Sequence, residues 1–314
     1  MEKQKLIILT GPTAVGKTSL SIRLAKAING AVISADSMQV YEYMDIGSAK
    51  IRPEEMDGVD HYLVNCLKPW EPFNVVIFQQ MARQAMTRIY SEGKIPILVG
   101  GTGFYIQAVL YDIDFTENDG DDTYRKELEA IARTEDGPEI LHQRLSNIDP
   151  QAAEEIHPHN TKRVIRALEF YAQTSRPISE HNVEQRSKES PYDFRYFVLT
   201  DDREKLYRRI DRRVDQMISD GLAEEVRALL NMGCERTMTS MQGLGYKEII
   251  DYLTGEITLD EAVYRIKRDT RHFAKRQLTW FKRERDVIWL DKRDYPDETQ
   301  LLNAILTECY SPGI

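Results

Sequence analysis

The sequence predicts an α/β fold: a parallel sheet flanked by helices, with an all-helical insertion and a helical C-terminal region. Two observations predict the sheet. Short apolar segments alternate with amphipathic segments in the first third of the chain, and a glycine-rich loop joins the first expected strand to the first expected helix. A long polar stretch of helical periodicity without strand character predicts the insertion. Strands separated by helices form parallel sheets that are covered on both faces.

The first third supplies four expected strands and two expected helices. The strands are residues 6–10, 31–35, 62–64 and 96–99. One helix spans residues 17–29, and the other has Ile77, Met81, Ala85 and Ile89 on one face. This alternation predicts that the first part of the core ends near residue 113.

From residue 114 to about residue 193 the sequence predicts helices only, at 122–133, 138–146 and 160–173. Strand character returns at 196–199 and at 287–290, so we expect the chain to rejoin the same sheet. The remaining expected helices are 203–220, 222–232, 246–253 and 259–283. The expected domains are therefore 1–113, the insertion 114–193 and 194–314.

Composition limits the possible classes of protein. Hydrophobic residues make up 41% of the 314 positions and charged residues 30%, which permits a folded core. Because no apolar run is long enough for a signal peptide or a membrane span, we expect a cytoplasmic protein that does not bind membranes. The three cysteines lie too far apart for a zinc motif.

The net charge of −9 argues at first against a nucleic-acid partner, but the charges are unevenly distributed. Residues 112–139 hold 11 acidic and three basic residues, whereas residues 264–285 hold nine basic and two acidic ones. A solvated helix face would explain either block. The total charge therefore leaves RNA open as a partner.

Residues 11–18 match the pattern of a P-loop, because two glycines and a final Lys-Thr lie between a strand and a helix. In such a loop successive backbone N–H groups and the helix N-terminus surround one anion. Lys17 would reach the terminal phosphate and the Thr18 hydroxyl would bind Mg²⁺. The diphosphate-binding residues expected here are Gly11, Pro12, Thr13, Ala14, Val15, Gly16, Lys17 and Thr18.

Asp36 follows the second expected strand, at the end of the sheet where ligands bind in open α/β folds. Its position favours a catalytic or metal-binding carboxylate, although an aspartate followed by Ser37 also caps turns. The loop alone predicts a nucleotide hydrolase or kinase. No guanine-binding signature and no convincing Walker B acid accompany it.

Five segments together resemble the bacterial type of tRNA dimethylallyltransferase, or tRNA isopentenyltransferase. They are residues 11–18, residues 36–41 with 44–50, residues 98–102 with Tyr105, residues 245–247 and residues 275–280. These segments are distributed over residues 6–290. Ser48 and Gln242 depart from the usual pattern of the family, and neither is among the residues expected to take part in the reaction.

The resemblance implies transfer of a dimethylallyl group from dimethylallyl diphosphate to the N6 amine of the adenine immediately 3′ of the anticodon. It implies that Lys17 and Arg213 stabilise the departing diphosphate, with Arg209 as a second candidate, that Asp36 is the general base, and that Mg²⁺ is required. The positions that correspond to tRNA contacts are Asp36, Ser37, Met38, Gln39, Thr102, Arg125, Lys162, Arg163, Val164, Ile165, Arg166, Gln242, Gly243, Leu244, Gly245, Tyr246 and Lys247.

The expected partners are the anticodon stem-loop of tRNA and dimethylallyl diphosphate, bound by a monomer. Arg163 and Arg166, three residues apart on one expected helix, could meet one phosphate strand. The alternatives are a P-loop kinase for a small metabolite or nucleotide and an adenylate isopentenyltransferase. A non-catalytic RNA-binding module is a third alternative, disfavoured by Lys17, Thr18 and Asp36.

Overall fold

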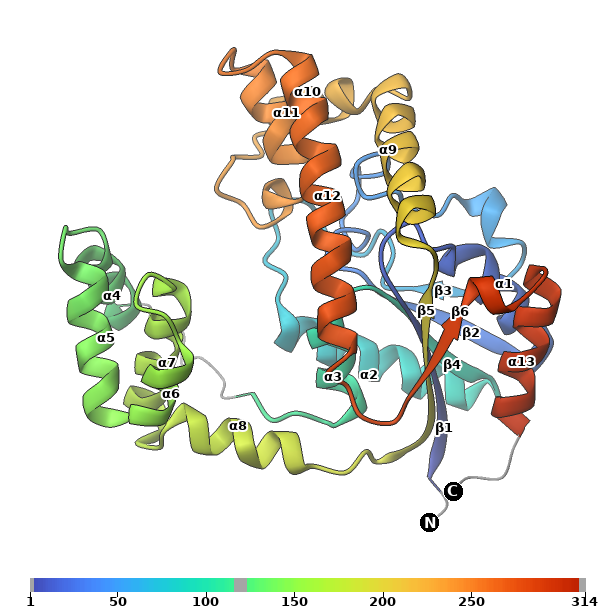
Figure 1. Ribbon diagram of the computed structural model, residues 1–314, viewed down its shortest axis with the longest axis horizontal. Coiled ribbons are helices and arrows are strands. Elements are labelled where there is room, and N and C mark those ends of the chain that lie inside the picture. Colours follow the sequence, from blue (N-terminus) through green and yellow to red (C-terminus); the bar gives the residue numbers. More distant parts are fainter. Residues whose placement is uncertain (1–2, 116–122, 311–314) are drawn as a thin grey trace. The chain divides into compact units, whose positions relative to one another are not determined.

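The computed structural model describes residues 3–115 and 123–310 (Figure 1). It divides into two compact units: unit 1 comprises Met1–Leu110 and Ser190–Ile314, and unit 2 comprises Tyr111–Glu189. Unit 1 contains a six-stranded sheet in the order β3-β2-β4-β1-β5-β6. All neighbouring strands are parallel, so the expected α/β fold is confirmed. The strands are β1 (Gln4–Thr10), β2 (Gly30–Ala35), β3 (His61–Tyr62), β4 (Ile95–Gly100), β5 (Tyr192–Thr200) and β6 (Val287–Asp291).

Helices cover both faces of the sheet, as its continuous apolar strands require. On one face Ile7 and Leu9 of β1 belong to a core cluster with α1 (Lys17–Ile28) and α13 (Glu298–Tyr310). Their neighbours Leu6 and Ile8 point to the opposite face and are equally buried. There α2 (Val75–Ser91) and α3 (Gly103–Leu110) pack against each other, and α2 packs on β2 and β4.

The C-terminal helices of unit 1 form a layer near the carboxyl ends of the strands (Figure 1). They are α9 (Arg203–Ser219), α10 (Leu222–Asn231), α11 (Tyr246–Leu253) and α12 (Leu259–Phe281). Helix α12 packs on α9, α11 and α3. The 3₁₀ turns η1 (Pro53–Met56), η2 (Ser240–Gln242) and η3 (Lys292–Asp294) lie in connections. Within the part of the chain that the structure describes, no helix has the length and apolarity needed to cross a bilayer.

Within its described residues, unit 2 contains helices and no strand. Its helices are α4 (Thr123–Ala132), α5 (Gly137–Ile148), α6 (Pro150–Glu155), α7 (Thr161–Thr174) and α8 (Ile178–Ser187). Leu128, Leu141, Leu145, Val164 and Leu168 form the centre of its own core. The unit therefore has a hydrophobic core of its own.

The structure differs from the expectations at several boundaries. The strand expected at 62–64 ends at Tyr62, because Leu63 adopts a positive φ of 61° that extended backbone does not allow. Helix α2 buries Phe78 and Ala82 in place of Ile77 and Met81. Helices α3, α6, α8 and α13 were not expected, and residue 122 lies outside the described residues. Unit 2 ends at Glu189, four residues before the expected boundary, because β5 already begins at Tyr192.

Candidate functional site

The P-loop lies at the carboxyl end of β1, in the middle of the sheet. Gly11 has φ of +143° and Gly16 has φ of +100°, both in the region that favours glycine. A Cβ on Gly11 would lie 2.5 Å from the Leu199 carbonyl oxygen at the end of β5. Both glycines are therefore needed for the loop to turn tightly between β1 and α1.

The Lys17 ammonium turns back onto the loop, where Nζ donates to the carbonyl oxygens of Gly11 and Pro12, both at 2.9 Å. Burial, assisted by the positive charge of Arg213, lowers the pKa of Lys17 to about 8, and the negative charge of Asp36 partly opposes this shift. The side chain keeps part of its surface accessible, so its ammonium is desolvated without being sealed from solvent. A cation in this state would gain strongly from an anionic ligand.

Asp36 directly follows β2. Its Oδ1 accepts hydrogen bonds from the Met38 N–H at 2.8 Å and the Gln39 N–H at 3.4 Å, so the turn-capping role is present. The carboxylate nonetheless acts electrostatically on Lys17, Arg213 and Tyr105. None of the described ion pairs includes Asp36. One oxygen thus holds the turn, and the charge faces the same region as the P-loop lysine.

The two candidate arginines of α9 have different surroundings. Arg209 donates to the carboxylate of Asp201, which is 6% exposed, at 2.6 Å. Arg213 has a lowered pKa because of burial and the nearby Arg209, against the opposing charge of Asp36. Arg213 is also exposed to solvent, which screens its charge. The structure thus brings Arg213, not the occupied Arg209, into the group with Lys17 and Asp36.

Thr102 lies next to Asp36 because β2 and β4 are neighbours. The Thr102 N–H donates to the carbonyl oxygen of Ala35 at 3.3 Å, and the Thr102 carbonyl accepts the first hydrogen bonds of α3. A Cβ on Gly100 would lie 2.2 Å from the Ala35 oxygen, so only glycine permits this approach. Tyr105, one turn later, has its pKa raised to about 12 mainly by burial.

Two of the expected tRNA-binding segments contact each other. A Cβ on Gly243 would lie 2.9 Å from the Met38 sulfur, so residues 36–39 meet residues 242–247. The phenol of Tyr246 is fully buried against Gly47. Tyr246 thus supports the segment from beneath, whereas Gln242 is exposed and its side-chain amide donates to the Arg236 carbonyl oxygen.

The expected tRNA-binding residues of unit 2 fall into two groups. Lys162 and Arg163 are exposed and Arg166 is half-buried on α7, and none of the three appears in a described ion pair. Val164 and Ile165 are buried in the core of the unit. Arg125 donates to the buried carboxylate of Glu169 at 2.9 and 3.2 Å, so much of its charge is already neutralised within the unit.

Sequence analysis missed three residues that build this region. Lys50 is buried and donates to the Tyr41 carbonyl, Asp45 and Asn65 at 2.6–2.7 Å. Glu225 of α10 holds the loop 45–47, and Gln277 of α12 contacts the P-loop. The signature segments containing Lys50 and Gln277 mark both residues, but no local pattern distinguishes Glu225.

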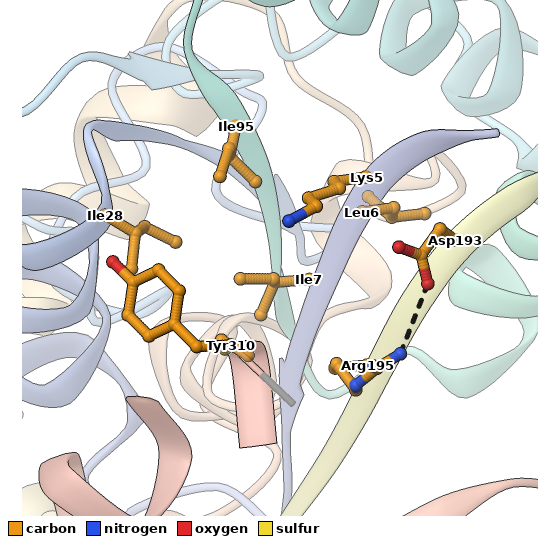
Figure 2. Close-up of a pocket in the computed structure, with 9 residues that line it drawn as sticks. Lys5, Leu6, Ile7, Ile28, Ile95, Asp193, Arg195 and Tyr310 are labelled. Carbon is orange, nitrogen blue, oxygen red and sulfur yellow. Dashed lines mark hydrogen bonds and ion pairs between the residues drawn. The ribbon is translucent and has the colours of Figure 1, made fainter. Parts of the chain in front are cut away.

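A small pocket of about 30 Å³ lies at the amino ends of the strands (Figure 2). Its lining includes Lys5, Ile95 and the ion pair between Asp193 and Arg195, at 3.2 Å. These residues stand at the amino ends of β1, β4 and β5, opposite the P-loop. The pocket is separate from the candidate site.

Comparisons with known proteins match nearly the whole chain. The family model described as "IPP transferase" matches residues 39–284, and the model "Isopentenyl transferase" matches residues 4–67. The tRNA dimethylallyltransferase of Lachnoclostridium phytofermentans is 64% identical over 308 residues, covering 97% of this chain and 98% of the relative. That of Carboxydothermus hydrogenoformans is 53% identical over 305 residues, covering 97% of each chain.

Solved structures agree with this match. The tRNA isopentenylpyrophosphate transferase of Bacillus halodurans is 46% identical, with a TM-score of 0.72 over 98% of this chain and 97% of that chain. A eukaryotic dimethylallyltransferase described as acting on tRNA is 30% identical, with a TM-score of 0.84 over 99% of this chain and 81% of that chain. The chain therefore belongs to the IPP transferase family, the transferases that prenylate tRNA.

Proposed function

We propose that this enzyme transfers the dimethylallyl group of dimethylallyl diphosphate to the N6 amine of the adenine immediately 3′ of the anticodon, releasing diphosphate. The allylic C–O bond to the diphosphate breaks, a C–N bond to the adenine amine forms, and the amine loses one proton. The observation that carries this proposal is a P-loop whose Lys17 ammonium returns to the Gly11 and Pro12 carbonyls, with Asp36 at the carboxyl end of β2 in the same sheet.

The diphosphate would bind in the P-loop. Loop amides and the N-terminus of α1 would face its oxygens, as in other helix-terminal anion sites. Lys17 would exchange its bonds to the Gly11 and Pro12 carbonyls for bonds to phosphate. Arg213 would add a second positive charge, which favours departure of the anion as the C–O bond breaks.

The residues at the loop fit a Mg²⁺ ion that binds together with the diphosphate. Thr18 exposes its side chain at the start of α1, and a hydroxyl oxygen is a ligand that Mg²⁺ accepts beside phosphate oxygens and water. Within residues 3–115 and 123–310 no group of three His, Cys, Asp or Glu side chains could hold a metal alone. The ion would supply further positive charge to the leaving group.

Asp36 would accept the proton that the adenine amine loses. Its Oδ1 accepts from the Met38 N–H, and the residue lies beside Thr102, whose N–H donates to the Ala35 carbonyl. The adenine must leave its stack to reach this position, which costs a few kcal/mol and least in a loop. Thr102 and the segment 242–247 would border the base.

The helical unit would hold the anticodon stem. Lys162, Arg163 and Arg166 provide cations without described ion-pair partners on one helix, which suits phosphate contacts. Arg125 would contribute mainly by fixing α4 to α7 through Glu169. Neither a kinase nor an adenylate isopentenyltransferase would need such a surface.

The test is incorporation of labelled dimethylallyl diphosphate into unmodified tRNA, followed by nucleoside analysis. Asp36→Asn is the informative variant, because its amide oxygen can still accept from Met38 while the base is lost. Transfer should fall by about 10²–10⁴-fold, with tRNA affinity changed by no more than a few fold. Near-normal turnover would exclude Asp36 as the base, and phosphoryl transfer from ATP would favour a kinase.

A further inference from the structure

Gln277 of α12 connects two loops that belong to different parts of the site. Its Oε1 accepts a hydrogen bond from the Thr13 N–H of the P-loop at 2.9 Å. Its Nε2 donates to the Gly101 carbonyl oxygen, after β4, at 3.0 Å. The side chain is 6% exposed, so both bonds are largely shielded from water. One side-chain amide thus fixes the P-loop to the turn that carries Thr102.

The fit between α12 and this turn depends on glycine. A Cβ on Gly101 would lie 2.0 Å from Gln277 Nε2, and a Cβ on Gly103 would lie 2.2 Å from the Trp280 ring. Gln277 and Trp280 are three residues apart, on one face of the helix. Two side chains of α12 therefore occupy the space that side chains of the turn would take.

We propose that Gln277 is a positioning residue that sets the distance between the diphosphate and the acceptor base. This inference rests on the proposed function, in which the P-loop holds the donor and Thr102 borders the acceptor. The bond from the Thr13 N–H to Gln277 fixes the P-loop to α12. A displacement of about 1 Å between reacting groups can cost on the order of 10²-fold in rate.

A double-mutant cycle between Gln277 and Gly101 tests this inference. Gly101→Ala should displace the Gln277 amide, because the new methyl group would overlap Nε2. Gln277→Ala should lower kcat by about 10–100-fold at saturating substrates. In the Gln277→Ala background, Gly101→Ala should add less than about a threefold loss, because the overlapping atom is absent. If the fold losses in kcat of the two single variants multiplied in the double variant, the inference would be overturned.

A matched variant separates positioning from stability. Gln79 is also buried and donates to a backbone carbonyl, that of Ala108, at 2.6 Å, in the packing between α2 and α3. Gln79→Met and Gln277→Met should both lower Tm by several degrees. Only Gln277→Met should lower kcat by more than about fivefold, because only its partners include the P-loop. An equal kcat for the two variants would refute the positioning role.

Diphosphate binding gives a readout that does not depend on transfer. Calorimetric titration with inorganic diphosphate and Mg²⁺ should show about 5–20-fold weaker binding to Gln277→Met than to wild type, since one loop anchor is lost. The Gln79→Met affinity should be unchanged. If the wild type transfers no prenyl group, the proposed function is refuted. The comparison of diphosphate affinities still tests whether Gln277 positions the P-loop. Equal diphosphate affinities together with wild-type kcat would refute it.

Discussion

The Tyr246 hydroxyl donates to the Glu225 carboxylate at 2.8 Å, and the same carboxylate accepts from three consecutive backbone N–H groups of residues 45–47, at 2.7–3.0 Å. Each carboxylate oxygen receives two of these four hydrogen bonds. Burial and the Glu225 charge together raise the pKa of Tyr246 well above its usual value. The pair therefore attaches the loop of residues 45–47 to α10 and α11, beneath the expected tRNA-binding segment 242–247.

We expect Glu225→Gln to destabilise the protein by about 2–4 kcal/mol, because an amide nitrogen would replace one oxygen that accepts two hydrogen bonds. Denaturant unfolding would measure the change. Glu224→Gln is the matched control, since Glu224 is exposed and pairs with Arg227 at 3.6 Å. Equal stabilities for the two variants would show that the bonds to the loop contribute little.

Binding of the allylic diphosphate should weaken as the pH rises above about 8. With its pKa lowered to about 8, Lys17 is charged below this pH and loses its proton above it. For one such group kcat/KM for the diphosphate should fall about tenfold per pH unit above that pKa. Lys17→Arg keeps the charge, so its profile should be lower and flat in this range. A wild-type profile that stays flat to pH 9.5 would contradict this role.

Replacing Arg163 and Arg166 by alanine should weaken binding of all substrate tRNAs alike. A phosphate contact is sequence-independent and releases counterions, so the slope of log K against log salt should flatten by roughly one to two units. Arg176→Ala is the control, because Arg176 in the same unit pairs with Glu184 at 3.1 Å. The measurement is tRNA affinity at several salt concentrations, and a slope equal to that of wild type would assign the two arginines to a solvated face.

Glu284 should make the protein less stable as the pH rises. Burial raises the pKa of this carboxyl to about 7, against the hydrogen bond that Gln107 donates to it at 3.0 Å. Between its unfolded pKa of about 4.5 and pH 7 the folded state binds the extra proton, so the Glu284 contribution to stability is lost over this window. Glu284→Gln should match the wild-type Tm near pH 4.5 and exceed it at pH 8.

Glu154, which is exposed, provides the control for the Tm measurements on Glu284→Gln. Glu154→Gln should leave the pH dependence of Tm unchanged, because an exposed carboxylate has no burial penalty to remove. If Glu284→Gln and wild type differed by the same amount at both pH values, the Glu284 proton would have no part in the stability.

The sequence by itself determined the α/β class, the P-loop, the strand ends that carry Asp36 and Thr102, and the family. These features depend on local pattern: apolar runs of strand length, helical periodicity, and glycine and lysine at fixed spacing. It did not determine helix α3, whose continuous apolar sequence lacks a helical period, or the end of β3 at Leu63, where positive φ interrupts the strand.

Only the tertiary structure decided which side chains surround the loop. The sequence does not distinguish Arg209 from Arg213, whereas in the structure the buried Asp201 carboxylate pairs with Arg209. Glu225 and Gln277 reach residues about 180 and 264 positions away in the chain. Such contacts arise from the packing of α10 and α12 against loops at the sheet edge, and pairings between distant elements leave no periodic trace in the sequence.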